Sequence, residues 1–187
     1  MRVIAGSARR TNLKTVEGMS TRPTTDRIKE TLFNMIQSDL YDCLFLDLFS
    51  GSGAIGIEAL SRGAKRCYFV ENQKAAVQCI RDNLKATHLE NKGILLECDV
   101  MSALHRIQGK EKPFDFIFMD PPYDKELELH VLDELRNMDY VDAYTTIIVE
   151  ASKSTKFDYL KDFGYEISKI KEYKTNKHVF IHKIEKQ

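Results

Sequence analysis

Short apolar runs alternate with longer amphipathic segments from residue 43 onward. In the segment 73–89, for example, Val77, Ile80 and Leu84 recur at helical spacing. The apolar runs predict strands at 43–49, 66–71, 93–98, 114–120 and 145–151. The segments between them predict helices at 54–63, 73–89, 103–107 and 126–138. Strands that alternate with helices predict βαβ units and a parallel sheet, the α/β class.

The end of the chain departs from this alternation. Residues 165–174 and 178–184 are two strand-like segments separated by the short polar stretch Thr-Asn-Lys. Two such segments joined by a short turn predict a β-hairpin. The last strand should therefore run antiparallel to its neighbours.

The start of the chain also differs from the middle. Residues 2–6 and 12–16 predict two short strands, and residues 22–37 predict a helix. The apolar stripe of that helix comprises Ile28, Leu32, Met35 and Ile36, and its candidate caps are Thr24, Thr25 and Asp26. No linker sets this part apart. We expect residues 1–40 to be an N-terminal extension packed on a domain of residues 41–187, in one compact unit.

Composition restricts the class of protein. The chain has 187 residues and 43% apolar residues, enough for one domain with a proper core. It has no apolar run near the length of a membrane span, and its start lacks the apolar stretch of a signal peptide. Its four cysteines are scattered and its five histidines form no ligand set. We expect free, buried thiols, no metal and a cytoplasmic location.

Charge is distributed unevenly although the net charge is zero. Residues 1–29 carry seven Lys and Arg against two Asp and Glu, and residues 152–187 carry nine Lys against five acids. Two basic ends therefore flank an acidic middle. Solubilising surface charge would explain this pattern, but basic ends brought together by the fold would form a positive face for a polyanion.

A glycine-rich turn follows the first predicted strand. Gly51, Gly53 and Gly56 form a G-x-G-x-x-G pattern between that strand and the next helix. Glycines at this turn allow the backbone to approach a ligand closely. The pattern alone is a weak signal, since it also fits NAD-dependent oxidoreductases.

Acidic residues at the strand ends make the ligand more specific. Asp47 just before the turn could accept from a ligand ammonium or a loop N–H, Glu71 could accept both ribose hydroxyls, and Asp99 could accept from an adenine amine. A ligand with adenine, ribose and an amino acid group is S-adenosylmethionine. The alternative is that Asp47 and Asp99 only cap loops. The predicted cofactor residues are Asp47, Phe49, Ser50, Gly51, Ser52, Gly53, Glu71, Asn72, Asp99 and Val100.

The fourth predicted strand ends in Asp120, Pro121, Pro122 and Tyr123. An exocyclic amine of a base is a poor nucleophile because its lone pair is delocalised. Asp120 and the carbonyl of Pro121 could each accept one N–H of this amine, so that its lone pair faces a methyl donor. Pro122 would set the carbonyl direction and Tyr123 could stack on the base. We predict these four residues to be catalytic; a simple turn would explain the prolines but not the acid and the aromatic together.

These residues resemble a known family. The sequences "DLFSGSG" and "DPPY" are similar to those of S-adenosylmethionine-dependent methyltransferases that modify amino groups. With "RVIAG" and "TRPTTDRIKETLFN", the chain resembles over its whole length the RsmD family of bacterial 16S rRNA guanine-N2 methyltransferases. The resemblance implies a Rossmann-like class I methyltransferase fold with a seven-stranded mixed sheet whose last strand is antiparallel. It also implies that the substrate is one guanine of the small ribosomal subunit; we expect a monomer.

The N-terminal segment is where the resemblance implies RNA contacts. The family usually has Arg-Gly-Arg, where this chain has Arg9, Arg10 and Thr11. Lys29 is expected to be a solvated helix residue, with phosphate contact as the alternative. The predicted RNA-binding residues are Arg2, Arg9, Arg10, Arg22 and Thr24.

Other functions fit parts of the pattern. A DNA adenine or cytosine amino-methyltransferase would share the "DPPY" corner but usually needs a target-recognition domain, for which the chain leaves no room. A protein glutamine N5-methyltransferase should lack the basic N-terminus. A non-enzymatic RNA-binding module would not need the acids at the strand ends.

Overall fold

A computed structural model describes residues 1–16, 26–122 and 126–185 of the chain. Seven strands form one sheet in the order β3-β2-β1-β4-β5-β7-β6. The strands are β1 (Leu44–Asp47), β2 (Arg66–Val70), β3 (Gly93–Leu96), β4 (Phe116–Met119), β5 (Thr146–Ser152), β6 (Tyr165–Glu172) and β7 (Asn176–Lys183). The helices are α1 (Asp26–Ile36), α2 (Ala54–Ser61), α3 (Lys74–Ala86), α4 (Val100–Ile107) and α5 (Leu127–Leu135), with a 3₁₀ turn at Gln37–Asp39.

The predicted α/β alternation and the antiparallel last strand are confirmed. Strands β1 to β5 pair in parallel, and β7 pairs antiparallel with both β5 and β6. Strand order reverses between β1 and β4, because β2 and β3 lie on one side of β1 and β4 lies on the other. In open α/β sheets, ligands bind beyond the carboxyl ends of the strands at such a switch point.

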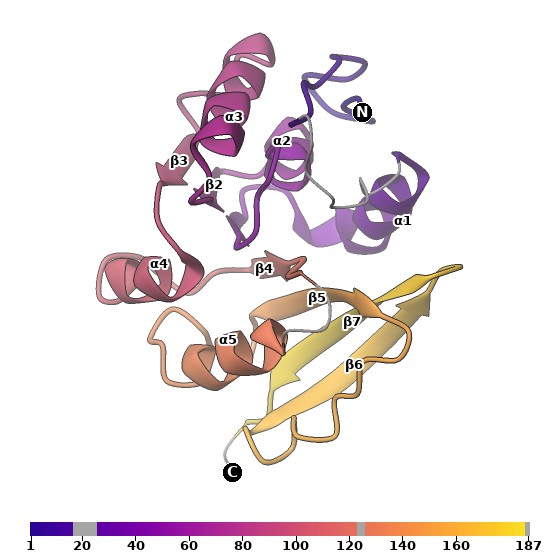
Figure 1. Cartoon of the computed structure of the whole chain (residues 1–187), viewed down its shortest axis with the longest axis vertical. Helices are drawn as coiled ribbons and strands as arrows, with labels where there is room; N and C mark the ends of the chain where they lie inside the picture. The colour runs from indigo at the N-terminus through magenta and orange to yellow at the C-terminus, as the bar shows by residue number, and fades with distance from the viewer. Residues whose placement is uncertain (17–25, 123–125, 186–187) are drawn as a thin grey trace.

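The central strands of the sheet are buried on both faces, whereas β6 is exposed along most of its length. Along β4, Phe116 and Phe118 face one hydrophobic cluster, and Ile117 and Met119 face the other. Helices α1, α2 and α3 contribute to the first cluster, and α4 and α5 to the second. Figure 1 shows these two helical layers on opposite sides of the sheet. Strands covered on both faces explain the nearly continuous apolar runs in the sequence.

The N-terminal segment is less regular than predicted. Instead of two strands, it forms a turn with one isolated antiparallel bridge between Arg2 and Asn12, and the N–H of Leu13 also donates to the carbonyl of Met1 at 2.9 Å. One reason is that some of its backbone donors bind α2 instead of the facing arm of the segment: the N–H groups of Ile4 and Ala5 donate to the carboxylate of Glu58 at 2.9 and 3.0 Å. The segment lies beside α2 in Figure 1.

Apolar contacts join this segment to the rest of the fold. Val3, Ala8 and Leu13 are buried in the same cluster as Phe33 of α1 and Phe45 of β1. The extension and the sheet therefore share one core on the α1–α3 face. The division of the chain after residue 40 stays a prediction.

The expectation that Lys29 is solvated was wrong. Its side chain is fully buried, donates to the carbonyl of Arg2 at 2.6 Å and pairs with Glu58 at 3.2 Å. Burial lowers the pKa of Lys29, and the charge of Glu58 opposes this shift. Arg62 pairs with the other oxygen of Glu58 at 2.8 Å and lies over the ring of Phe33. A helical pattern cannot show this burial, because the partner lies on another helix.

Two further observations concern the whole described chain. None of the helices in residues 1–16, 26–122 and 126–185 is long and apolar enough to cross a membrane. The four cysteines are free; Cys43, Cys67 and Cys79 are buried and Cys98 is half-buried. Burial raises the pKa of the Cys43 thiol to about 12, so that this thiol is unreactive at neutral pH.

Replacing Glu58 should lower the stability of the protein more than replacing any residue on its surface. In the Glu58→Gln variant, Lys29 and Arg62 lose their buried counter-charge, and breaking such a pair costs about 3–5 kcal/mol. We expect the free energy of unfolding in urea to fall by this amount. Glu30→Gln, on the exposed side of α1, is the matched control and should change it little. A Glu58→Gln protein as stable as the control would contradict this role.

Candidate active site

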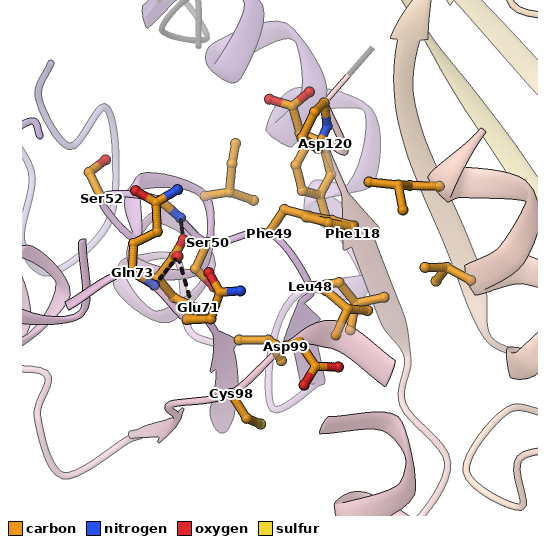
Figure 2. Close-up of a pocket in the computed structure, with 18 of the residues that line it drawn as sticks. Leu48, Phe49, Ser50, Ser52, Glu71, Gln73, Cys98, Asp99, Phe118 and Asp120 are labelled. Carbon is orange, nitrogen blue, oxygen red and sulfur yellow. Dashed lines mark hydrogen bonds between the residues drawn. The ribbon is translucent and has the colours of Figure 1, made fainter. Parts of the chain in front are cut away.

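A cavity of about 740 Å³ lies at the carboxyl ends of the parallel strands. Its walls come from the segments that follow β1, β2, β3 and β4 and from the start of α5. Figure 2 shows Glu71, Asp99 and Asp120 around it, together with Phe49, Ser50 and Ser52 of the glycine-rich turn. This volume is typical of small-molecule sites.

The glycine-rich turn forms one wall because its backbone is compact. Gly53 has φ of +79°, in the left-handed region, and is the cap residue of α2. A Cβ on Gly56 would lie 2.4 Å from the ring of Phe69 and 2.5 Å from the sulfur of Cys67, so that only glycine lets α2 pack this closely on β2. Gly51 has nothing within 4 Å of a Cβ position and borders the cavity. The first glycine is thus open to a ligand, and the third serves packing.

Glu71 connects the turn to the end of β2. One carboxylate oxygen accepts from the N–H of Gly51 at 2.9 Å, and the other accepts from the N–H groups of Asn72 and Gln73, both at 2.9 Å. Glu71 also lines the cavity, with Asn72 and Gln73 beside it. This carboxylate therefore orders the cavity wall and faces the space where a ligand would bind.

Asp99 also has both a structural role and a place in the cavity wall. It caps α4, accepting from the N–H of Ser102 at 2.9 Å and from its hydroxyl at 2.6 Å. These hydrogen bonds hold the pKa of Asp99 below its ordinary value, so that the carboxylate stays charged. Asp99 and Val100 both line the cavity. Capping and ligand contact are compatible here, although the sequence presented them as alternatives.

Asp47 lies beneath the turn and is not among the residues that line the cavity. It is 1% exposed, and one oxygen accepts from the N–H of Gly56 at 3.2 Å. Burial raises the pKa of Asp47 to about 7, against the effect of that hydrogen bond. Its other oxygen is buried and finds no hydrogen-bond partner within the part of the chain that the structure describes. Direct contact between Asp47 and a ligand stays a prediction.

The described residues of the "DPPY" corner lie on the cavity wall opposite the end of β2, as Figure 2 shows for Asp120. Asp120 and Pro122 line the cavity, whereas Pro121 is buried, and Tyr123 lies outside the described residues. Burial, together with the charges of Glu150 and Asp47, raises the pKa of Asp120 to about 8. An acid with this pKa exchanges protons readily near neutral pH, as general bases do.

Several lining residues were not predicted. Leu48, Cys98 and Phe118 are in or next to the strand ends, and the same strand-end rule could have found them. Other lining residues come from the chain start and from helices, where no local signal marks them: Met1, Ala54, Ile55, Met101, Leu127, His130 and Val131. The turn residue Gly53, although predicted, does not line the cavity.

The predicted RNA-binding residues differ in their surroundings. Arg9 and Arg10 are exposed, and Arg2 pairs with Asp26 at 3.6 Å while its side chain remains 62% exposed. Arg22 and Thr24 lie outside the described residues. Arg10 has φ of +73°, a left-handed conformation that suits glycine. Arginine at this position therefore strains the turn.

A buried amide links the basic segment to the cavity wall. Asn83 of α3 donates to the carbonyls of Lys14 and Ser52 at 3.0 and 2.9 Å, and it accepts from the N–H of Lys14 at 2.8 Å. One side chain thus binds both the N-terminal segment and the glycine-rich turn. The two parts are held in one fixed arrangement.

The fold and the cavity are those of the class I methyltransferases. Solved structures that are similar to this chain belong to that class. The structure of yhhF from Escherichia coli, a candidate methyltransferase, superimposes with a TM-score of 0.83, at 29% identity over 100% of this chain and 99% of that one. A family model described as "Conserved hypothetical protein 95" matches residues 1–182.

Two relatives with curated names identify the family within this class. YlbH of Bacillus subtilis, named as a candidate rRNA methyltransferase, is 48% identical over 71% of this chain and 71% of its own length. The ribosomal RNA small subunit methyltransferase D of Escherichia coli K12 is 34% identical over 81% of this chain and 74% of its own. The chain belongs to this methyltransferase family, the RsmD family, which confirms the resemblance in its sequence.

Replacing Arg10 by glycine should stabilise the protein. Relief of the left-handed strain outweighs the extra flexibility of glycine in the unfolded chain, for a net gain of about 0.5 to 1 kcal/mol. Thermal unfolding of Arg10→Gly should therefore occur at a higher temperature. Arg9→Gly is the control, because Arg9 has no positive φ and should lose stability. Equal effects of both changes would rule out strain at Arg10.

Proposed function

We propose that this protein transfers a methyl group from S-adenosylmethionine to the exocyclic N2 of a guanine in 16S rRNA of the small ribosomal subunit. The observation that carries this proposal is the position of Asp120. It borders the same cavity as Glu71 and the glycine-rich turn, in a chain of the RsmD family. The two curated relatives above are named as rRNA methyltransferases, and the small subunit is in the name of the Escherichia coli protein.

The residues present fit S-adenosylmethionine. The cavity can hold this molecule together with a base, and carboxylates stand at the ends of β2 and β3 for ribose and adenine. The buried oxygen of Asp47 that has no partner among the described residues suits an ammonium or an intervening water. When bound, S-adenosylmethionine supplies an electrophilic methyl group on a sulfonium. Glu71 would accept both ribose hydroxyls, Asp99 the adenine amine, and the turn at Phe49–Gly53 would support the amino acid part.

The "DPPY" corner would prepare the amine. Asp120 and the Pro121 carbonyl accept its two N–H bonds, which leaves the lone pair directed at the methyl group. Pro122 lacks an N–H and restricts φ, so the direction of the Pro121 carbonyl is rigid. Tyr123 would stack on the guanine, a contact typically worth about 1–3 kcal/mol per base. Catalysis then depends mainly on positioning.

The N-terminal segment would bind the RNA. Arg9 and Arg10 are exposed on a turn that Asn83 holds against the cavity wall, so phosphates bound there lie at a set distance from the cofactor. Arg2, Arg22 and Thr24 complete the proposed RNA-binding set. Phosphate contacts of this kind position a substrate without reading its sequence. We propose a monomer acting on the small subunit or a late assembly intermediate.

Methylation of isolated ribosomal particles tests the proposal. Purified protein with labelled S-adenosylmethionine should label 16S rRNA in small subunits from a strain that lacks the enzyme, and digestion should yield N2-methylguanosine. Subunits from the parent strain, which are already modified, are the control. Label found only in DNA or in protein would instead support one of the other amino-methylating functions.

Removing the charge of Asp120 should slow the reaction without preventing cofactor binding. Asp120→Asn can still contact the amine but cannot take its proton, so we expect the methyl-transfer rate to fall by about a hundred- to ten-thousandfold. Calorimetry should find an unchanged affinity for S-adenosylmethionine. Asp158→Asn, at an exposed position away from the cavity, should keep the normal rate. A normal rate in Asp120→Asn would remove this residue from the mechanism.

A further inference from the structure

A row of buried polar side chains continues from Asp120 across the sheet. Met119 of β4 is in register with Val149 of β5, so that Asp120 and Glu150 are the next pair along these parallel strands. Glu150 is in turn in register with His178 of β7. All three alternate with residues of the other cluster and therefore lie on the α1–α3 face. None of the predicted site residues except Asp120 belongs to this row.

Hydrogen bonds hold Glu150 in place. One carboxylate oxygen accepts from the amide of Asn176 at 2.6 Å, and the other lies 3.1 Å from Nε2 of His178. Glu150, Asn176 and His178 are 4%, 5% and 0% exposed. A buried carboxylate with two such contacts cannot rotate away from its neighbours without leaving polar atoms unpaired.

His178 is fixed as firmly as Glu150. Its Nδ1 is 3.1 Å from the hydroxyl of Tyr173, and its ring meets that of Phe118 edge-on with centroids 6.0 Å apart. Burial raises the pKa of Tyr173 to about 12, so its hydroxyl stays neutral and can donate to Nδ1. With Nδ1 as acceptor, Nε2 carries the hydrogen and donates to Glu150. Phe118 also lines the cavity, so this group of residues directly supports the cavity wall.

This row places the carboxylate of Glu150 beside Asp120, the acid at the proposed reaction site. Two carboxylates that share a poorly solvated region raise each other's affinity for a proton. Glu150 and Asp47 are the neighbouring acids whose charges act on Asp120. Other titratable groups lie around the cavity and the row, after β2, before α4, on α5, on β7 and in the β6–β7 turn: Glu71, Asp99, His130, His178 and Tyr173.

We propose that Glu150, held by Asn176 and His178, is a positioning residue that makes Asp120 a stronger proton acceptor in the methyl-transfer reaction. This inference rests on the proposed function. In the reaction, the bond between sulfur and the methyl carbon breaks with its electron pair going to sulfur, while the amine nitrogen forms a bond to that carbon. The nitrogen then carries a positive charge and loses one proton to the Asp120 carboxylate, which passes it to water. Glu150 touches none of the reacting atoms and acts only through Asp120.

The pH dependence of methyl transfer distinguishes this role from a purely structural one. The rate should rise with pH as Asp120 ionises, and loss of the neighbouring charge in Glu150→Gln should move this rise to lower pH by about one unit. A structural role would lower the melting temperature but leave the position of the rise unchanged. Glu166→Gln, at the far end of the β6–β7 hairpin, is the control and should match the parent. Folded Glu150→Gln with an unshifted profile would overturn the proposal.

If Glu150→Gln does not fold, a titration of the unmodified protein tests the proposed effect of Glu150 on Asp120 instead. Carbon-13 NMR of the side-chain carboxyls, with Asp120 assigned by Asp120→Asn, should show that Asp120 does not titrate in a single independent step but is coupled to a neighbouring acid. A single independent step for Asp120 would overturn the proposal. This titration involves no substrate, so that failure of the proposed function and failure of the Glu150–Asp120 coupling give different results.

Discussion

The buried carboxylate of Glu58 is the interaction on which the arrangement of the N-terminal third depends. It pairs with Lys29 and Arg62 and accepts from the backbone N–H groups of Ile4 and Ala5. Two cations and two backbone donors therefore satisfy one fully buried anion. Because a buried charge that loses a partner costs several kcal/mol, these elements hold one another in place.

The contacts of Glu58 affect function because they fix the position of the N-terminal segment. They hold the basic N-terminal segment on α2, whose first turn follows the glycine-rich loop. Asn83 adds a second connection, since its amide binds both Lys14 and Ser52. The segment proposed to bind RNA and the wall proposed to bind the cofactor are thus parts of one rigid unit, as positioning of a base for in-line transfer requires.

The carboxylates at the strand ends also maintain the fold. Glu71 orders the glycine-rich turn, Asp99 caps α4, and Asp47 accepts from the first turn of α2. Each is placed by structural hydrogen bonds before any ligand arrives, so that binding requires little reordering. Asp120 in the "DPPY" corner differs from Asp99, because burial and neighbouring acids raise its pKa. The hydrogen bonds of Asp99 lower its pKa and keep it charged, whereas the raised pKa of Asp120 makes this proposed base ready to take a proton.

The sequence by itself determined the alternation of strands and helices, the glycine-rich turn and the acids at the strand ends. These are local patterns, and the carboxyl ends of parallel strands meet at one edge in any such sheet. Only the tertiary structure decided that Lys29 is buried, that the N-terminal segment binds α2 rather than forming strands, and that Glu150 and His178 extend the row from Asp120. Those features arise between elements far apart in the chain, where pairing depends on strand register and helix packing, which no local pattern encodes.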